Sequence, residues 1–201
     1  MLLLRGRSFF LQNVLLAFMH DTPFVVHNSD GFTYLDEGPR EAPHPPVVLL
    51  HGMLGDLSNW TDTIRRLSDA NYRVLTPVMP VYGLPLRDTS VPGLATHFHE
   101  FILHLGLDSA ILTGNSLGGH IALLYALDHP DRVAAMALSG SSGIYEAHLG
   151  TSTMRRYDRD FIRERTELKF YDPVHATDEL FDEMLDVVCD RPRAIRLIKF
   201  A

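Results

Sequence analysis

Between residues 47 and 139, short apolar runs alternate with longer stretches whose apolar residues recur every three or four positions. The apolar runs are expected to be strands buried on both faces, at 47–50, 72–77, 110–113 and 133–138. The stretches between them have the period of helices that pack on a sheet, at 58–71, 90–105 and 117–128. Because a helical crossover joins parallel strands, the alternation predicts an α/β fold, with a mostly parallel, doubly wound sheet and helices on both faces.

Two further segments flank this alternation. Before it, residues 24–26 and 32–35 surround the turn sequence Asn28-Ser29-Asp30-Gly31, which predicts a β-hairpin. After it, residues 144–201 are charged and helical in pattern, with Thr177 expected to cap a helix over 178–190. We therefore divide the chain into an N-terminal extension over 1–20, a core portion over 21–143 and a helical cap over 144–201.

Charge and cysteine content narrow the possible partners and compartments. The net charge of −7 argues against a nucleic-acid partner, and the lone Cys189 fits a reducing compartment, so we expect a cytoplasmic protein. The longest uninterrupted apolar run among the first twenty residues, 14–19, is too short to span a bilayer, so no stable membrane insertion is expected. We hypothesise that Met19 is the natural initiator; an amphipathic membrane-surface segment is the alternative for these residues.

The sequence Gly114-Asn115-Ser116-Leu117-Gly118 has the G-x-S-x-G pattern and stands between a predicted strand and a predicted helix. A strand that turns at once into a helix strains the central residue, and the residues two before and two after it must lack bulk. Glycine fills both positions. The turn would present the Ser116 hydroxyl at a helix N-terminus, which favours developing negative charge. Ser116 is therefore the candidate catalytic nucleophile.

A second motif, His51-Gly52-Met53-Leu54-Gly55, directly follows the predicted strand at 47–50. Acyl transfer needs two N–H donors aimed at the position where the oxyanion develops. We expect these donors to be the backbone amides of Leu117 and Met53, since Gly52 lets the chain bend. Asn115 and Leu54 are the expected substrate-binding residues. His51 is interpreted as a hydrogen-bonded residue that shapes this loop, and not as the catalytic base.

In their order and context the two motifs resemble the α/β-hydrolase superfamily, over roughly residue 24 to the end of the chain. The resemblance implies a cap-containing serine hydrolase that forms an acyl-enzyme on a small-molecule substrate, with no organic cofactor and no metal. The Gly114-Asn115-Ser116 elbow is similar to that of carbon–carbon bond hydrolases acting on aromatic ring-fission products. Those enzymes have a more Gly-Pro-rich oxyanion loop than residues 53–56, so a carboxylic ester and a C–C bond next to a carbonyl both stay open. A non-catalytic hydrolase-fold binding protein is the alternative from another class.

The resemblance also implies an acid and a histidine after Ser116, and we expect the chain to end before the strands that carry them. None of the histidines after Ser116 is expected to be the base: His120, His129, His148 and His175. A short form that uses Glu146 or His148 instead is the lesser alternative. We expect this chain to be nearly inactive, and its sheet to have an unpaired apolar edge that promotes self-association. The oligomeric state stays open.

Two charged or metal-like clusters have simpler interpretations. His99 and His104 are five residues apart, whereas the zinc-protease pattern needs a spacing of four. His97, Glu100 and His104 share a helix face that we interpret as solvated surface, so no metal site is predicted. The predicted cap contains a group of arginines that alternate with acidic residues: Arg155, Arg156, Arg159, Arg163 and Arg165. This alternation favours an ion-paired surface over contact with a substrate carboxylate.

Overall fold

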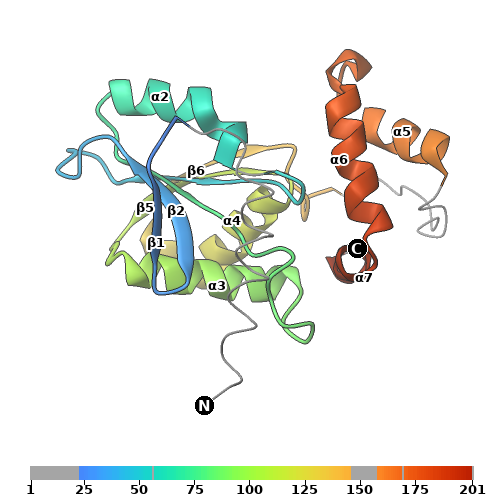
Figure 1. Cartoon of the computed structure of the whole chain (residues 1–201). Helices are drawn as coiled ribbons and strands as arrows, with labels where there is room; N and C mark the ends of the chain where they lie inside the picture. Colours follow the sequence, from blue (N-terminus) through green and yellow to red (C-terminus); the bar gives the residue numbers. More distant parts are fainter. Residues whose placement is uncertain (1–22, 56, 146–157, 169, 201) are drawn as a thin grey trace. The chain divides into compact units, whose positions relative to one another are not determined.

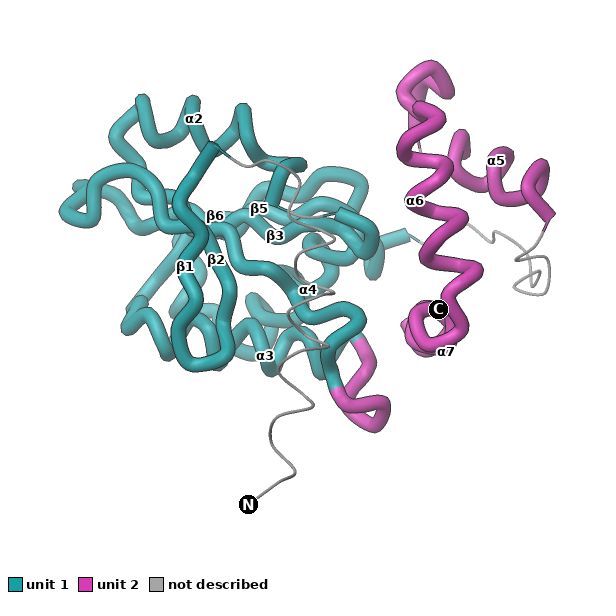
Figure 2. The backbone as a smooth tube through the Cα atoms, in the orientation of Figure 1, with its two compact units in different colours: residues 1–84, 91–146 teal, residues 85–90, 147–201 magenta. Residues whose placement is uncertain are grey.

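The computed structural model describes residues 23–55, 57–145, 158–168 and 170–200. The predicted extension over 1–20 and its Met19 lie outside these residues. Figure 2 shows that the chain forms two compact units. Unit 1 comprises residues 1–84 and 91–146, and unit 2 comprises residues 85–90 and 147–201. Each unit is described by itself.

Unit 1 is built on a six-stranded sheet in the order β1-β2-β4-β3-β5-β6 (Figure 1). Strands β3, β4, β5 and β6 run parallel, while β1 pairs antiparallel with β2 and β2 pairs antiparallel with β4. Their bounds are β1 Val26–Ser29, β2 Phe32–Glu37, β3 Val47–Leu50, β4 Val74–Pro77, β5 Ala110–Asn115 and β6 Val133–Ser139. The predicted α/β fold with a mostly parallel sheet is therefore confirmed.

Helices cover both faces of this sheet. Helix α2 (Thr61–Asp69) lies on one face, and α3 (Val91–His104) and α4 (Leu117–Asp128) lie on the other (Figure 1). Every residue of β3 and β4 is buried, as continuous apolar strands between two helical layers require. The helix predicted to start at residue 58 instead begins with a 3-10 turn, η1 (Leu57–Trp60), before α2. A second 3-10 turn, η2 (Pro130–Arg132), leads into β6.

The antiparallel hairpin is attached to the parallel strands by a buried ion pair. The Asp36 side chain on β2 is 4% exposed and accepts two hydrogen bonds from Arg73, at 2.8 Å from Nε and 2.9 Å from Nη2. These bonds raise the pKa of Arg73 and keep it charged. The pair fixes the register between β2 and β4 next to residue 74. In a shifted register each of the two charges would be buried without its partner, which is costly.

The histidines of α3 are packed rather than solvated, so the sequence interpretation of this helix face is wrong for them. The rings of His97 and His104 lie 5.0 Å and 5.2 Å from the ring of Phe32 on β2. Glu100 between them is exposed. The hairpin folds over this side of α3, and that long-range contact leaves no trace in the helical period of the sequence.

Burial makes the fold sensitive to acid at His97. Desolvation lowers the pKa of His97 from its ordinary 6.5, and the charge of Glu100 opposes this only in part. The unfolded chain therefore binds a proton at a higher pH than the folded chain does. The stability from neutral His97 is complete above pH 6.5 and is lost as the pH falls below that value.

We expect His97→Phe to lose less of its free energy of unfolding than the wild type between pH 7.5 and 5.5. His44→Phe, at an exposed histidine, is the control and should follow the wild type; equal slopes in all three denaturation series would contradict the assignment.

Unit 2 is helical. It contains α5 (Arg159–Glu167), a 3-10 turn η4 (Pro173–His175), α6 (Asp178–Cys189) and α7 (Arg191–Phe200). Thr177 caps α6 as predicted, since its side chain accepts from the Leu180 amide at 3.3 Å. Arg163 pairs with Asp178 at 3.0 Å and Arg159 with Asp182 at 3.8 Å, so these arginines bind acids of α6 rather than acids of their own helix. Arg155 and Arg156 lie outside the described residues. None of the described helices combines the length and apolar character needed to cross a bilayer.

Candidate active site

Ser116 occupies a one-residue turn between β5 and α4. Its backbone has φ 52° and ψ −117°. The φ angle is positive, which is uncommon for a non-glycine residue, and the ψ angle lies outside the left-handed helical region. Such a conformation costs on the order of 1–3 kcal/mol and persists when the surrounding structure enforces it. The strained strand-to-helix turn predicted from the motif is therefore present.

Close packing around this turn leaves no room for side chains at the flanking glycines. A Cβ atom on Gly114 would lie 2.5 Å from the carbonyl oxygen of Gly118, and one on Gly118 would overlap the carbonyl oxygen of Leu50 at the end of β3. The predicted requirement for small residues two before and two after Ser116 is thus confirmed. Helix α4 starts directly against the central strand.

The end of β6 holds the turn from its other side. The Ser116 amide and the Asn115 side-chain amide both donate to the carbonyl oxygen of Ser139, each at 3.1 Å. The Ser142 amide donates to the carbonyl oxygen of Ser116 at 3.2 Å. Sequence reasoning missed this contribution, because nothing in residues 139–142 marks them as neighbours of position 116.

The loop after β3 lies against the same turn. A Cβ atom on Gly52 would lie 3.4 Å from the Cβ of Ser116 and 3.2 Å from Oδ1 of Asn115. Parallel strands β3 and β5 are neighbours, so the loops at their carboxyl ends meet at one edge of the sheet. The two sequence motifs are therefore brought together.

His51 organises this loop from inside the protein. The side chain is buried, with Nδ1 2.8 Å from the carbonyl oxygen of Gly52 and Nε2 2.9 Å from the amide nitrogen of Met79. A neutral ring satisfies both contacts, with Nδ1–H donating and Nε2 accepting from the amide. Both ring nitrogens are thereby occupied, which agrees with the structural role expected for His51. The sequence offered no sign that Met79 would be its partner.

The remaining predicted site residues lie around the turn. Met53 and Leu54 follow Gly52 and are half-buried, and the Met53 carbonyl oxygen accepts from the Tyr82 hydroxyl at 3.5 Å. Leu117 is 3% exposed and is the first residue of α4. Asn115 is exposed, but its amide nitrogen is already bound to Ser139. Tyr82 is a further residue at this loop that sequence reasoning missed.

No described histidine is hydrogen-bonded to the Ser116 hydroxyl. The ring of His120 faces the loop after β6, where a Cβ atom on Gly143 would lie 2.6 Å from its Cδ2. His129 stacks on His99 of α3 at 4.1 Å between ring centroids. Glu146 and His148, which belong to the lesser alternative of a short form, lie outside the described residues. Within the described part of the chain, no group of three or more His, Cys, Asp or Glu residues is placed to hold a metal ion.

A mostly parallel sheet with a strained residue between the strand and helix at its carboxyl edge defines the α/β-hydrolase architecture. The chain belongs to this family, since the model of the alpha/beta hydrolase fold matches residues 45–186.

The similar proteins include hydrolases of several kinds. A 2-hydroxy-6-oxo-6-phenylhexa-2,4-dienoate hydrolase of Comamonas testosteroni is 27% identical over 192 residues, covering 86% of this chain and 63% of that protein. A dihydrolipoyllysine-residue acetyltransferase component of the acetoin cleaving system of Pseudomonas putida is 31% identical over 70% of this chain and 39% of that protein. The crystal structure of MGS-MChE2, an alpha/beta hydrolase from a lagoon-sediment metagenome, matches this chain with a TM-score of 0.67 and 31% identity. The match covers 88% of this chain and 64% of the MGS-MChE2 chain. The chain therefore spans less than two thirds of the length of each of these proteins.

Proposed function

We propose that this protein is a serine-nucleophile hydrolase in which Ser116 attacks a carbonyl carbon and forms an acyl-enzyme. The observation that carries the proposal is the strained backbone of Ser116 at the carboxyl edge of the sheet. Strain of this kind gathers at active sites, where it presents a reacting side chain in a fixed direction. The packing of Gly114 and Gly118 and the hydrogen bonds to Ser139 enforce that direction here.

In the proposed reaction the Ser116 hydroxyl gives its proton to a base and its Oγ forms a bond to the substrate carbonyl carbon. The carbonyl oxygen becomes an oxyanion, which the backbone amides of Met53 and Leu117 would hold. Collapse of this intermediate expels a protonated leaving group, and water then releases the acid from Ser116. The approach of Gly52 to the Ser116 side chain supports this pairing of the two loops.

The proposed substrate is a small carboxylic ester or a compound with a C–C bond next to a carbonyl. The carbon–carbon hydrolase among the similar proteins supports the second chemistry, and the Met53–Leu54 loop supports the first. Asn115 would contact substrate through Oδ1, because its nitrogen is bound to Ser139. Leu54 would line an apolar pocket, and residues 144–201 would be the helical cap of the enzyme. We propose a cytoplasmic enzyme that does not bind nucleic acid, does not insert stably into a membrane and uses no cofactor.

The test is labelling by a fluorophosphonate probe, which reacts with an activated serine, on the protein as isolated from its natural source. We expect one labelled site, identified by mass spectrometry at Ser116. Ser116→Ala introduced into the same gene should abolish the label, and Ser58→Ala, at an exposed serine of η1, should leave it unchanged.

A non-catalytic hydrolase-fold binding protein is the second candidate. It is favoured by one observation, the lack of a hydrogen bond between the Ser116 hydroxyl and any described histidine. Without a base, a serine hydroxyl is a poor nucleophile at neutral pH. An unlabelled natural protein, or a label at a serine other than Ser116, would rule out the hydrolase and favour the binding protein.

A further inference from the structure

The ring of His51 joins two backbone segments at the carboxyl edge of the sheet. It is buried, with Nδ1 2.8 Å from the carbonyl oxygen of Gly52 and Nε2 2.9 Å from the amide nitrogen of Met79. A backbone amide can only donate, so Nε2 is the nitrogen without a proton and Nδ1 carries the proton. The Met79 amide therefore selects one tautomer of His51. In that tautomer the ring is a donor to the Gly52 carbonyl oxygen.

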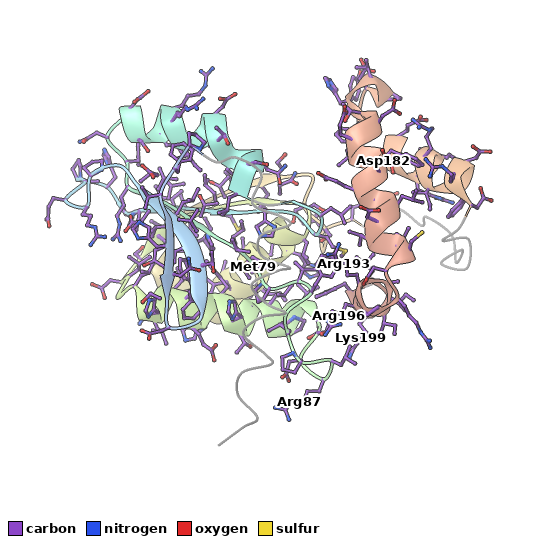
Figure 3. All side chains as sticks on the ribbon, viewed as in Figure 1. Met79, Arg87, Asp182, Arg193, Arg196 and Lys199 are labelled. Atoms are coloured by element: carbon purple, nitrogen blue, oxygen red, sulfur yellow. The ribbon has the colours of Figure 1, made fainter. Side chains whose placement is uncertain are left out.

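The Met79 amide is itself held in a fixed direction. Met79 lies on the loop after β4, within unit 1, and is 4% exposed (Figure 3). Just before it, the Val78 amide donates to the carbonyl oxygen of Thr33 on β2 at 2.8 Å. Just after it, the Val81 amide donates to the carbonyl oxygen of Met79 at 2.8 Å. Hydrogen bonds on both sides thus fix the Met79 N–H, and with it the orientation of the His51 ring.

The hydrogen bond from His51 also orients the amide of the next residue, Met53. The Gly52 carbonyl group and the Met53 N–H belong to one peptide unit, which is planar and trans. In such a unit the C=O and N–H bonds point in opposite directions. A donor on the Gly52 carbonyl oxygen therefore turns the Met53 N–H to the side away from the His51 ring. The Gly55 amide donates to the same oxygen at 3.1 Å, so two donors fix this unit.

The same peptide unit is packed against the elbow. A Cβ atom on Gly52 would lie 3.4 Å from the Cβ of Ser116. A Cβ atom on Gly118, in the first turn of α4, would lie 2.7 Å from the carbonyl oxygen of His51. The backbone on both sides of the oriented amide is therefore close to the candidate nucleophile.

We infer that His51 is a positioning residue, whose Nδ1–H orients the Met53 amide toward the oxyanion that would form at Ser116. The inference rests on the proposed hydrolase function, because the oxyanion exists only in that reaction. Its physical content is preorganisation: a donor that is oriented before the reaction costs no reorganisation while charge develops. Met79 belongs to the same device, since its amide holds the ring in the donating tautomer.

Two amide side chains separate the two hydrogen bonds of the ring. In His51→Asn the side-chain nitrogen takes the place of Nδ1 and still donates to the Gly52 carbonyl oxygen, while the Met79 amide loses its acceptor. In His51→Gln the longer side chain brings its oxygen to the Met79 amide, while the Gly52 carbonyl oxygen loses the ring donor. Both variants are uncharged and each gives up one buried hydrogen bond, so their stability costs are matched.

Steady-state hydrolysis of p-nitrophenyl acetate measures the catalytic effect, on the protein isolated from its natural source with each variant introduced into its gene. Loss of one oxyanion donor costs about 10²–10³ in kcat, so we expect His51→Gln to lose about tenfold or more. KM should stay nearly unchanged, because the Met53 amide would act on the transition state and not on the bound ester. His51→Asn should keep most of the wild-type kcat. A purely structural role of His51 predicts equal losses in the two variants.

NMR spectra of the 201-residue chain test the orientation without any activity. The ¹⁵N shifts of the wild-type His51 ring should show a proton on Nδ1 and none on Nε2. The Met53 amide signal should move further in His51→Gln than in His51→Asn, and the Met79 amide signal should do the reverse. Both variants lose the same ring current, so the difference between them reports the hydrogen bonds. A proton on Nε2 would overturn the inference even if neither variant folds.

The two measurements separate this inference from the proposed function. A natural protein labelled at Ser116 by the fluorophosphonate probe, whose two His51 variants lose kcat equally or move the Met53 signal equally, would overturn the inference and leave the hydrolase in place. An unlabelled protein would refute the proposed function and with it the oxyanion role of Met53. The NMR comparison would then decide by itself whether His51 orients that amide.

Discussion

Gly118→Ala will unfold unit 1 or destabilise it by about 3 kcal/mol or more, the upper end of the cost of overpacking. Position 118 lies in the first turn of α4, where alanine is intrinsically favoured over glycine by about 1 kcal/mol. The added Cβ, however, would overlap the carbonyl oxygen of Leu50. Leu50 cannot retreat, because β3 is paired on both sides by β4 and β5. The packing cost therefore outweighs the gain in helix propensity.

Chemical denaturation of the two proteins measures this difference. Gly106→Ala is the control, because that glycine has φ +63° and nothing within 4 Å of a built Cβ. Its free energy of unfolding should fall only by the cost of a left-handed backbone conformation at a non-glycine residue, about 1–2 kcal/mol. A Gly118→Ala protein as stable as wild type would show that α4 does not contact β3 as closely as described.

The 201-residue chain assayed alone will hydrolyse p-nitrophenyl acetate at a rate similar to that of its Ser116→Ala form. The reason is that no described histidine is hydrogen-bonded to the Ser116 hydroxyl. When the triad members of a serine hydrolase are lost, binding and oxyanion contacts leave roughly 10³–10⁴-fold acceleration over water. That lies orders of magnitude below a normal esterase.

The outcome of this assay is informative in both directions. A chain with the rate of an ordinary esterase, abolished in Ser116→Ala, would mean that the chain contains its own base. His148→Ala and Glu146→Ala would then identify it, since both residues follow the elbow in sequence. A rate unaffected by both of these substitutions but lost in Ser116→Ala would point to a base elsewhere in the chain.

Much of unit 1 could be predicted because local sequence constrains it strongly. The run of β3 is apolar throughout and that of β4 is interrupted only by Thr76, so both strands are expected to be buried on both faces of an α/β sheet. The Asp30-Gly31 turn needs two positive φ angles, which these residues tolerate, and it fixes the hairpin. The G-x-S-x-G motif likewise predicted the strained turn, since both of its glycines are required sterically.

Packing between distant segments was not predictable in the same way. The apolar period of residues 90–105 predicted the helix α3, but it left His97 and His104 on a face that the sequence analysis interpreted as solvated. Phe32, about 70 residues earlier in a hairpin, covers them. The contacts of Met79 with His51 and of Ser139 with Ser116 join segments that carry no mutual signal in the sequence.

The sequence by itself determined the fold class and the position of the elbow, because both follow from hydrophobic period and from local backbone sterics. The tertiary structure alone decided which loops meet at Ser116 and which histidines are buried. These features depend on strand order and on the approach of side chains from distant segments, and strand order is set by the free energy of the whole packed sheet rather than by any one segment.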